Sequence, residues 1–198
     1  MGECTGITFI DSTRIPVCEN KRQSRNRVFK GYAQKGKSTM GWYYGFKLHL
    51  LCNERGELLN FALTRANVDD RNPKVFNDLT KDLFGKLYAD KGYISQSLFA
   101  SLFDRGVHIV TGIRTNMKNR LMDVHDKIML RKRSIIETIN DMLKNVAQIV
   151  HTRHRSISNF IVNLLAGIAA YAFYDTKPSI NMEFEREEKQ GVKQLTLF

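Results

Sequence analysis

The sequence predicts a mixed α/β fold in which helices flank a single sheet. Short runs of β-branched and aromatic residues alternate along the chain with segments of helical apolar periodicity, an order typical of a mixed sheet covered by helices. Hydrophobic residues make up 42% and charged residues 26% of the 198 positions, which is the composition of a folded domain. This length is sufficient to bury a hydrophobic core.

The first third of the chain is expected to form strands. Residues 6–12 are a β-branched and aromatic run that predicts a strand ending at Asp11. Residues 14–37 are dense in Lys, Arg, Gln, Asn and Ser without apolar periodicity, and they predict a basic loop. Residues 41–52 and 58–64 are joined by a glycine-containing turn, and they predict two antiparallel hairpin strands.

The middle of the chain is expected to alternate between helix and strand. Acidic residues followed by a proline indicate a helix start, and apolar residues every four positions predict a short helix over 73–83. Residues 86–90 predict a buried strand that ends at Asp90. A helix over 95–105 and a further strand over 107–111 are expected to follow.

Two helices and a tail are predicted for the remainder. Residues 127–151 have isoleucine, leucine and valine on one face and predict one long amphipathic helix. Residues 158–174 are apolar nearly all round, which indicates a buried helix. The composition becomes polar after this point, so we expect a domain over 1–174 and a flexible polar tail over 175–198.

The charge balance points to a polyanionic partner. The chain has 31 Lys and Arg against 20 Asp and Glu, a net charge of +11, which suits nucleic acid or an anionic membrane face. The longest apolar stretch, 160–174, is interrupted by Asn163 and is too short to span a bilayer. The three cysteines are scattered and no secretory signal is visible, so a cytoplasmic protein associated with the nucleoid is expected.

Three carboxylates are the candidate catalytic residues. Asp11 and Asp90 close two predicted strands, and Glu137 lies midway along the predicted long helix. Acids at strand ends can converge, and a hard divalent cation offsets the repulsion between them. Any one of them alone is more often a cap or surface residue, and Arg133 with Glu137 can be only an i, i+4 surface pair.

The predicted long helix strengthens the catalytic interpretation. At 100° per residue, Arg133, Glu137 and Lys144 fall within about 40° of one another on its surface. One face of the helix therefore presents a carboxylate between two cations. This arrangement suits a metal ligand beside a phosphodiester, because the acid binds the metal ion and the cations bind phosphate.

The segments around these acids resemble the catalytic motifs of bacterial insertion-sequence transposases of the Asp-Asp-Glu class. The matching segments are Ile10–Ser12, Tyr88–Tyr93, and Arg133–Glu137 followed by Lys144, the R-x3-E-x6-K signature. The resemblance extends from Gly6 to about Ile180. Many relatives carry a tyrosine three residues before the arginine, where this chain has Leu130.

The resemblance implies a ribonuclease-H-like fold and a transposase activity, namely cleavage at the ends of an insertion sequence and transfer of the cut strand into target double-stranded DNA. It implies that Asp11, Asp90 and Glu137 bind Mg²⁺, with two ions expected and Mn²⁺ as a substitute. One ion activates the nucleophile, a water and then a 3′-hydroxyl, while the other stabilises the leaving oxygen. A homodimer on DNA is also expected.

The position of the first acid qualifies this expectation. Transposases of this kind usually carry an additional N-terminal helical region, whereas Asp11 lies ten residues from Met1. We therefore expect a catalytic core without that region. Two alternatives stay open, a transposase remnant that binds DNA without catalysis and a ribonuclease-H-like DNA endonuclease that performs no strand transfer.

Basic and aromatic residues supply candidate DNA contacts. Together with Arg133 and Lys144, the predicted DNA-binding residues are Lys30, Lys35, Lys47, Lys91, Arg153 and Arg155. Trp42 and Tyr43 are interpreted as hairpin packing residues, with stacking on an unpaired base near a cut end as the alternative.

The last five residues form a separate motif. They resemble the Q-L-x-L-F peptide by which bacterial proteins dock on the replicative sliding clamp, and the matching positions are Gln194, Leu195, Leu197 and Phe198. Apolar residues at the end of a polar tail have no core to join but suit a hydrophobic groove on a partner. The alternative is that this end folds back on the domain.

Overall fold

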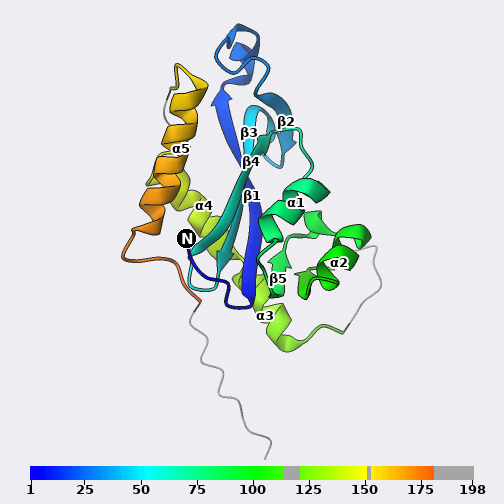
Figure 1. The fold of residues 1–198 in the computed structure, drawn as a ribbon. Coiled ribbons are helices and arrows are strands. Elements are labelled where there is room, and N and C mark those ends of the chain that lie inside the picture. Colours follow the sequence, from blue (N-terminus) through cyan, green and yellow to red (C-terminus); the bar gives the residue numbers. More distant parts are fainter. Residues whose placement is uncertain (114–120, 151–152, 181–198) are drawn as a thin grey trace, which may run out of the picture.

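The computed structural model describes residues 1–113, 121–150 and 153–180, and it shows a mixed sheet between helices (Figure 1). The strands are β1 (Ile7–Cys18), β2 (Gln34–Ser38), β3 (Gly41–Asn53), β4 (Leu58–Arg65), β5 (Gly85–Ala89) and β6 (Val107–Thr111). The helices are α1 (Pro73–Thr80), α2 (Gln96–Phe103), α3 (Val124–Lys132), α4 (Ser134–Asn145) and α5 (Ile157–Ala172), with short 3₁₀ turns η1 (Asn20–Arg25) and η2 (Lys91–Tyr93).

The sheet combines an antiparallel half with a parallel half. Its order is β2-β3-β1-β5-β6, and β4 pairs with β3 on the same side as β2. β3 runs antiparallel to β1, β2 and β4, whereas β5 and β6 run parallel to β1. The predicted mixed α/β class is therefore confirmed, and so is the predicted hairpin of two antiparallel strands.

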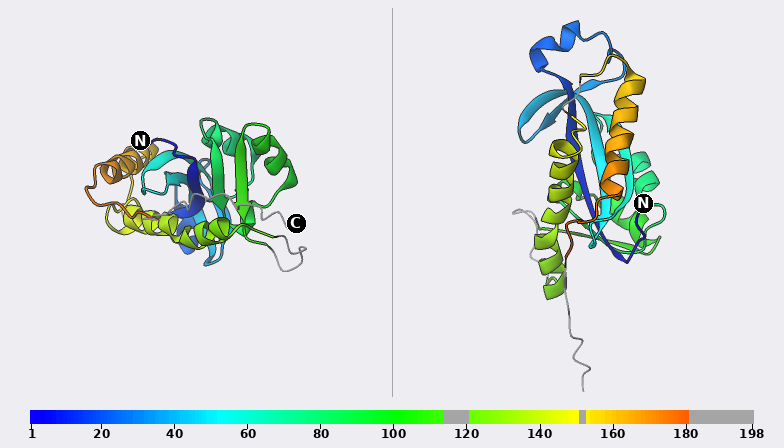
Figure 2. Two further views of the ribbon diagram at one scale, coloured as in Figure 1. Left: turned by 90° about the horizontal axis from the view of Figure 1, so that it is seen from below. Right: turned by 90° about the vertical axis from the view of Figure 1, so that its left-hand side faces the viewer.

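The helices cover both faces of the sheet (Figure 2). In β1, Phe9 belongs to the core under α4 and α5, while its neighbour Ile10 belongs to the core under α1 and α2. This division follows from the alternation of side chains along a strand. Asp11 shares the parity of Phe9, so its side chain lies on the α4 side of the sheet.

The predicted basic loop is largely replaced by regular structure. β1 continues to Cys18 because its second half pairs with the first half of β3, and Ile15 is fully buried there. Residues 34–38 form β2, which pairs with β3 from Gly41 to Gly45. Residues 34–38 carry no apolar alternation of their own, so only their pairing partner makes them a strand, whereas Ile15 and Val17 do alternate with Arg14 and Pro16 in the second half of β1.

The predicted long helix is two shorter helices. α3 ends at Lys132 and α4 begins at Ser134, with Arg133 between them in a helical conformation. α4 ends at Asn145 rather than at residue 151, and Gln148 has a φ of 54°, which a helix cannot continue through. Val146 consequently lies exposed instead of joining the predicted apolar face.

The chain beyond α5 remains in contact with the domain as far as Ile180. The backbone N–H of Ile180 donates to the carbonyl of Glu54 in the turn between β3 and β4, at 2.8 Å. Residues 181–198, including the predicted clamp-binding positions, lie outside the described residues. Within the described ranges, none of the helices has the length and apolar character needed to cross a membrane.

Candidate active site

The pairing of β1 with β5 brings the two aspartates to one level. The parallel register places Phe9 opposite Tyr88 and stops there. Asp11 lies two residues beyond Phe9, and Asp90 lies two residues beyond Tyr88, immediately after the end of β5. Asp11 was expected to close its own strand, which is wrong, because β1 continues to Cys18. It is the neighbouring strand β5 that ends, and this opens the space beside Asp11.

Arg133 joins the three predicted acids. Its guanidinium lies 3.0 Å from Glu137 Oε1, 3.9 Å from Asp11 Oδ1 and 4.0 Å from Asp90 Oδ1. The three carboxylates come from a strand, a strand end and the first turn of α4, and the guanidinium comes from the junction of α3 and α4. The structure therefore gathers these four sequence-predicted residues around one point.

The pKa of Asp11 is strongly perturbed. Its side chain is 24% exposed, and burial raises its pKa to about 6, although the guanidinium of Arg133 opposes this shift. The negative charges of Glu137 and Asp90 raise the pKa further. Burial and the neighbouring negative charges disfavour the ionised form of this carboxyl group, so a bound cation would stabilise it.

Two further polar residues of α4 reach β1. Asn140 donates from Nδ2 to Asp11 Oδ2 at 3.1 Å, and Lys144 donates to the hydroxyl of Thr13. Burial lowers the pKa of Lys144, and the charge of Arg14 lowers it further. Asn140 was not among the predicted site residues, although its position three residues after Glu137 on the same helical face is a signal that indicates it.

The acids line a cavity of about 400 Å³ whose other wall comes from the β2–β3 hairpin and the loop after β4. Lys37, Tyr43, Lys47 and Asp70 contribute to that wall, and Tyr93 of η2 also lines the cavity. Tyr93 is 3% exposed, and its hydroxyl has no hydrogen bond to any residue that the structure describes. Sequence reasoning missed both Asp70 and Tyr93 as members of the site.

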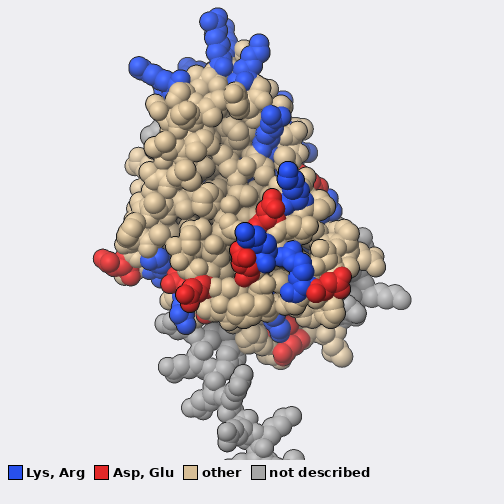
Figure 3. Space-filling view, viewed as in Figure 1, with Lys and Arg blue, Asp and Glu red and all other residues tan. Residues whose placement is uncertain are grey.

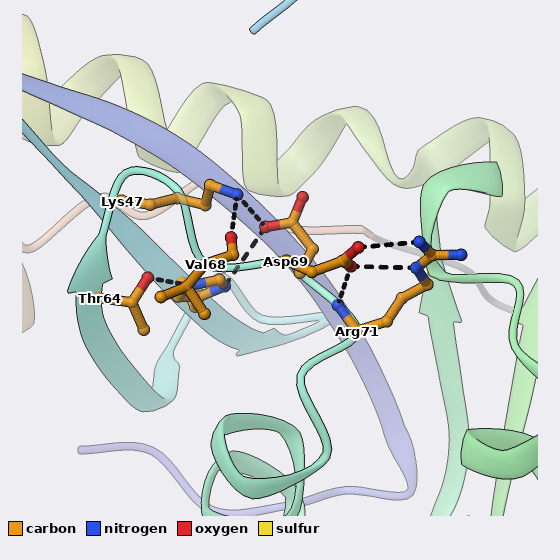
Figure 4. A network of polar contacts seen from close by, with 7 residues as sticks. Lys47, Thr64, Val68, Asp69 and Arg71 are labelled. Carbon is orange, nitrogen blue, oxygen red and sulfur yellow. Dashed lines mark hydrogen bonds and ion pairs between the residues drawn. The ribbon is translucent and has the colours of Figure 1, made fainter. Parts of the chain in front are cut away.

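A polar network orders the wall opposite the acids (Figure 4). Lys47 Nζ lies 3.0 Å from Asp70 Oδ1 and donates to the carbonyl of Val68 at 2.8 Å. His49, buried beside them, is hydrogen-bonded to Thr64 at 2.9 Å, and burial lowers its pKa to about 4. Lys47, a predicted DNA contact, thus lies in the cavity wall and is paired with a carboxylate.

α1 begins at Pro73, where the acidic residues and the proline had indicated a helix start, but the acidic side chains do not cap it. Asn72 caps the helix instead, accepting hydrogen bonds from the N–H groups of Lys74 and Val75. Asp69 accepts from Arg71 at 3.0 and 2.8 Å (Figure 4). Asp70 pairs with Lys47, so both acids are used to hold the loop that borders the cavity.

The other predicted DNA contacts lie at several places on the surface. Lys35 lies on β2, Lys91 lies in η2 directly after Asp90, and Lys30, Arg153 and Arg155 are exposed. Arg153 lines a cavity of about 690 Å³ together with three arginines near η1, Arg22, Arg25 and Arg27. Lys and Arg side chains stand out at the η1 end of the molecule, whereas the α5 side has few charges (Figure 3).

The fold and the site together define a catalytic domain of the ribonuclease-H-like class. A family model described as "Transposase DDE domain" matches residues 1–157, and the chain belongs to this family of nucleases and transposases. No curated protein matches the chain in sequence.

One solved structure with a similar fold is a synaptic complex of piggyBac transposase with hairpin DNA. Its TM-score is 0.51 at 12% sequence identity, and the alignment covers 86% of this chain and 46% of that chain. This chain thus spans about half the length of the piggyBac transposase chain. At this identity the likeness establishes the fold alone.

The donor set suits the divalent metal ions that this family generally uses. Three carboxylates offer the hard oxygen ligands that Mg²⁺ prefers, and the burial of Asp11 makes a compensating cation favourable. Within the described ranges no three His, Cys, Asp or Glu side chains are close enough together to hold one ion, and Arg133 lies among the acids. The carboxylate oxygens thus fit the metal by their chemistry and not by their present spacing, and in this structure the guanidinium supplies the positive charge among them.

Proposed function

We propose that this chain is the catalytic domain of an insertion-sequence transposase that cleaves DNA at the ends of the element and transfers the cut strands. The observation that carries this proposal is the convergence of Asp11, Asp90 and Glu137 on Arg133 at the edge of one cavity. Membership of the DDE transposase domain family supports it. A fold similar to that of a transposase whose structure contains hairpin DNA also supports DNA as the substrate.

In this proposal Asp11, Asp90 and Glu137 would hold Mg²⁺, with two ions expected and Mn²⁺ as a substitute. When bound, the metal lowers the pKa of the attacking water or 3′-hydroxyl and stabilises the leaving oxygen. Asn140 orients the Asp11 carboxylate through its 3.1 Å hydrogen bond. Arg133 and Lys144 bind phosphate beside the acids.

The DNA is proposed to follow β1 from the acids towards η1. Cys18 lies seven residues beyond Asp11, which is about 23 Å of extended strand. That length corresponds to about seven base pairs of duplex at 3.4 Å each. The arginine group at this end, Arg22, Arg25, Arg27 and Arg153, is then positioned to bind phosphates one turn or less from the cleavage site.

Incubation of the purified chain with supercoiled plasmid tests the activity. We expect Mg²⁺ or Mn²⁺ to support nicking, and we expect nicking to stop with a chelator and in Asp90→Ala, because that change removes one metal ligand while leaving β5 intact. The reaction is followed by the conversion of supercoiled to relaxed DNA on agarose gels. Addition of a pre-cut end with a free 3′-hydroxyl then measures strand transfer separately from hydrolysis.

The alternatives give different results in the same assay. Nicking without joining of the pre-cut end would identify a ribonuclease-H-like endonuclease, and DNA binding without metal-dependent nicking would identify a non-catalytic remnant.

We further propose that two copies act together on paired DNA ends. The mass of the complex with end DNA, measured by light scattering, is expected to correspond to two chains plus the bound DNA.

We also propose that residues 194–198 dock this chain on the bacterial sliding clamp. The proposal rests on the sequence Gln-Leu-Thr-Leu-Phe, whose apolar side chains suit a hydrophobic groove. Deletion of Gln194–Phe198 is expected to abolish co-purification with the clamp while plasmid nicking continues at the original rate. A matched variant with Lys189 and Lys193 changed to Ala should retain the clamp. Equal recovery of the clamp by the deleted chain would contradict the proposal.

A further inference from the structure

An exposed aromatic side chain lies against two lysines on the β2–β3 hairpin. Trp42 is 54% exposed, and the ammonium groups of Lys35 and Lys37 lie 5.2 and 5.9 Å from the centre of its ring. The antiparallel register pairs Lys37 directly with Trp42, so these side chains share one face of the hairpin. Gly36, which alternates with the lysines, faces the backbone of Ala66 on the other side.

This aromatic and basic group borders the candidate active site. Lys35, Lys37 and Trp42 line a cavity of about 470 Å³, a size within the range of about 300–1,000 Å³ that ligand pockets occupy. Four residues, Lys37, Lys47, Asp70 and Gly92, line both this cavity and the one that holds the three acids. A ligand in the first cavity is therefore adjacent to the second.

The basic side chains that line this cavity differ in whether a carboxylate already pairs with them. Lys47 is paired with Asp70, and Arg71 is held by Asp69 through two hydrogen bonds. Lys35 and Lys37, in contrast, form no ion pair within the described part of the chain, and both rest beside the indole. The cavity thus offers one flat aromatic surface and two uncompensated positive charges.

We propose that Trp42, Lys35 and Lys37 bind an unpaired nucleotide of the DNA strand that enters the active site. The indole stacks on the base, and the two ammonium groups bind the phosphates on either side of it. Stacking on an aromatic side chain requires a base whose face is free, which a base inside a duplex does not have. The site therefore selects frayed, overhanging or single-stranded DNA next to the scissile phosphate.

This inference rests on the proposed function, because the ligand is the DNA strand that reaches the acids. A basic surface attracts duplex DNA in general. The proposed site goes beyond this attraction, because it binds unpaired DNA more tightly than duplex. The two can be separated by measuring equilibrium binding with a chelator present, since no cleavage is then required.

The chain contains a single tryptophan, so its fluorescence reports on this site alone. A blunt duplex and the same duplex with an unpaired 3′ overhang are titrated into the protein in chelator. We expect the overhang to quench the emission of Trp42 and to bind about tenfold more tightly than the blunt duplex, since stacking contributes about 1–3 kcal/mol per base. Binding is measured in parallel by the anisotropy of labelled DNA.

Four variants complete the test. Trp42→Ala is expected to lose the tenfold preference for the overhang while its affinity for blunt duplex stays within twofold, and Trp42→Phe, which keeps a ring, should retain most of the preference. Phe173→Ala removes an exposed aromatic side chain at the end of α5 and should change nothing. Lys35→Ala with Lys37→Ala should weaken overhang binding and flatten its salt dependence.

The possible failures are distinguishable. If the protein binds and nicks DNA but the overhang neither quenches Trp42 nor binds more tightly than the blunt duplex, this inference is overturned and the proposed function stands. An unchanged preference in Trp42→Ala also overturns it. If neither DNA binds at all, the proposed function itself is contradicted.

Discussion

Asp11→Asn is expected to abolish cleavage and, at the same time, to make the folded protein more stable at neutral pH. Loss of a metal ligand should reduce nicking by at least about 10³-fold, which corresponds to about 4 kcal/mol of transition-state stabilisation. The gain in stability has a separate cause. Burial raises the pKa of Asp11 to about 6 from the ordinary value of 3.8, so the folded state resists its ionisation.

The raised pKa of Asp11 makes the free energy of unfolding depend on pH over a defined range. Between pH 3.8 and 6 the folded state binds the Asp11 proton more tightly than the unfolded state does, so the free energy of unfolding falls as the pH rises through this window. Above pH 6 the ionised group costs at most about 3 kcal/mol. The asparagine variant avoids this cost and can keep the hydrogen bond from Asn140. We expect it to be more stable than the original chain at pH 7.5 and equal to it near pH 3.5, as measured by urea unfolding.

Asp126 provides a matched control of opposite sign. Burial alone raises the pKa of this carboxyl, but hydrogen bonds from Lys86 at 2.7 Å and Tyr88 at 2.8 Å outweigh burial and lower it. Asp126→Asn should therefore lose stability at pH 7.5 and keep its nicking activity, because Asp126 lines a different cavity from the three acids. A destabilised Asp11→Asn variant at pH 7.5 would show that ionised Asp11 is not a net cost to the fold.

Arg133→Gln is expected to be the most destabilising change within the site. The guanidinium is 19% exposed and lies within 4.0 Å of three carboxylates, so its removal leaves like charges facing one cavity. We expect a loss of about 1–3 kcal/mol in chelator at pH 7.5, measured by urea unfolding. Arg71→Gln breaks an exposed pair with Asp69 and should cost less than about 1 kcal/mol.

The response to Mn²⁺ is expected to differ between Arg133→Gln and the original chain. Mn²⁺ should raise the melting temperature of Arg133→Gln more than that of the original chain, because the ion no longer competes with a guanidinium for the same carboxylates. Arg71→Gln should respond to Mn²⁺ as the original chain does. If Arg133→Gln is as stable as the original chain in chelator, the guanidinium does not neutralise the acids. If Mn²⁺ stabilises the two equally, the acids are not the metal site.

Local patterns predicted much of the fold correctly. Residues 107–111 form the expected strand, and the hairpin strands and α5 differ from their predicted limits by one or two residues. Side-chain alternation and helical periodicity are properties of neighbouring residues, so they are visible in the chain itself. The motifs around Asp11, Asp90 and Glu137 likewise identified residues that the structure gathers around Arg133.

Long-range pairing decided the rest. The existence of β2 depends on β3, a partner that no local pattern reveals, and β3 also pairs with the extension of β1 through Cys18, where the alternation of Ile15 and Val17 is short. The break at Arg133 turns one predicted helix into two, and it places the guanidinium where it meets all three acids.

What could be predicted from the chain alone is which residues are candidates for the site and in which type of element they lie. The tertiary structure decides which of these residues lie close together. The register of β1 and β5 places Asp11 beside Asp90, and packing brings Asn140 to Asp11. The raised pKa of Asp11 belongs to this second group. It arises because burial and neighbouring charges act through space, from β5 and α4, rather than along the sequence.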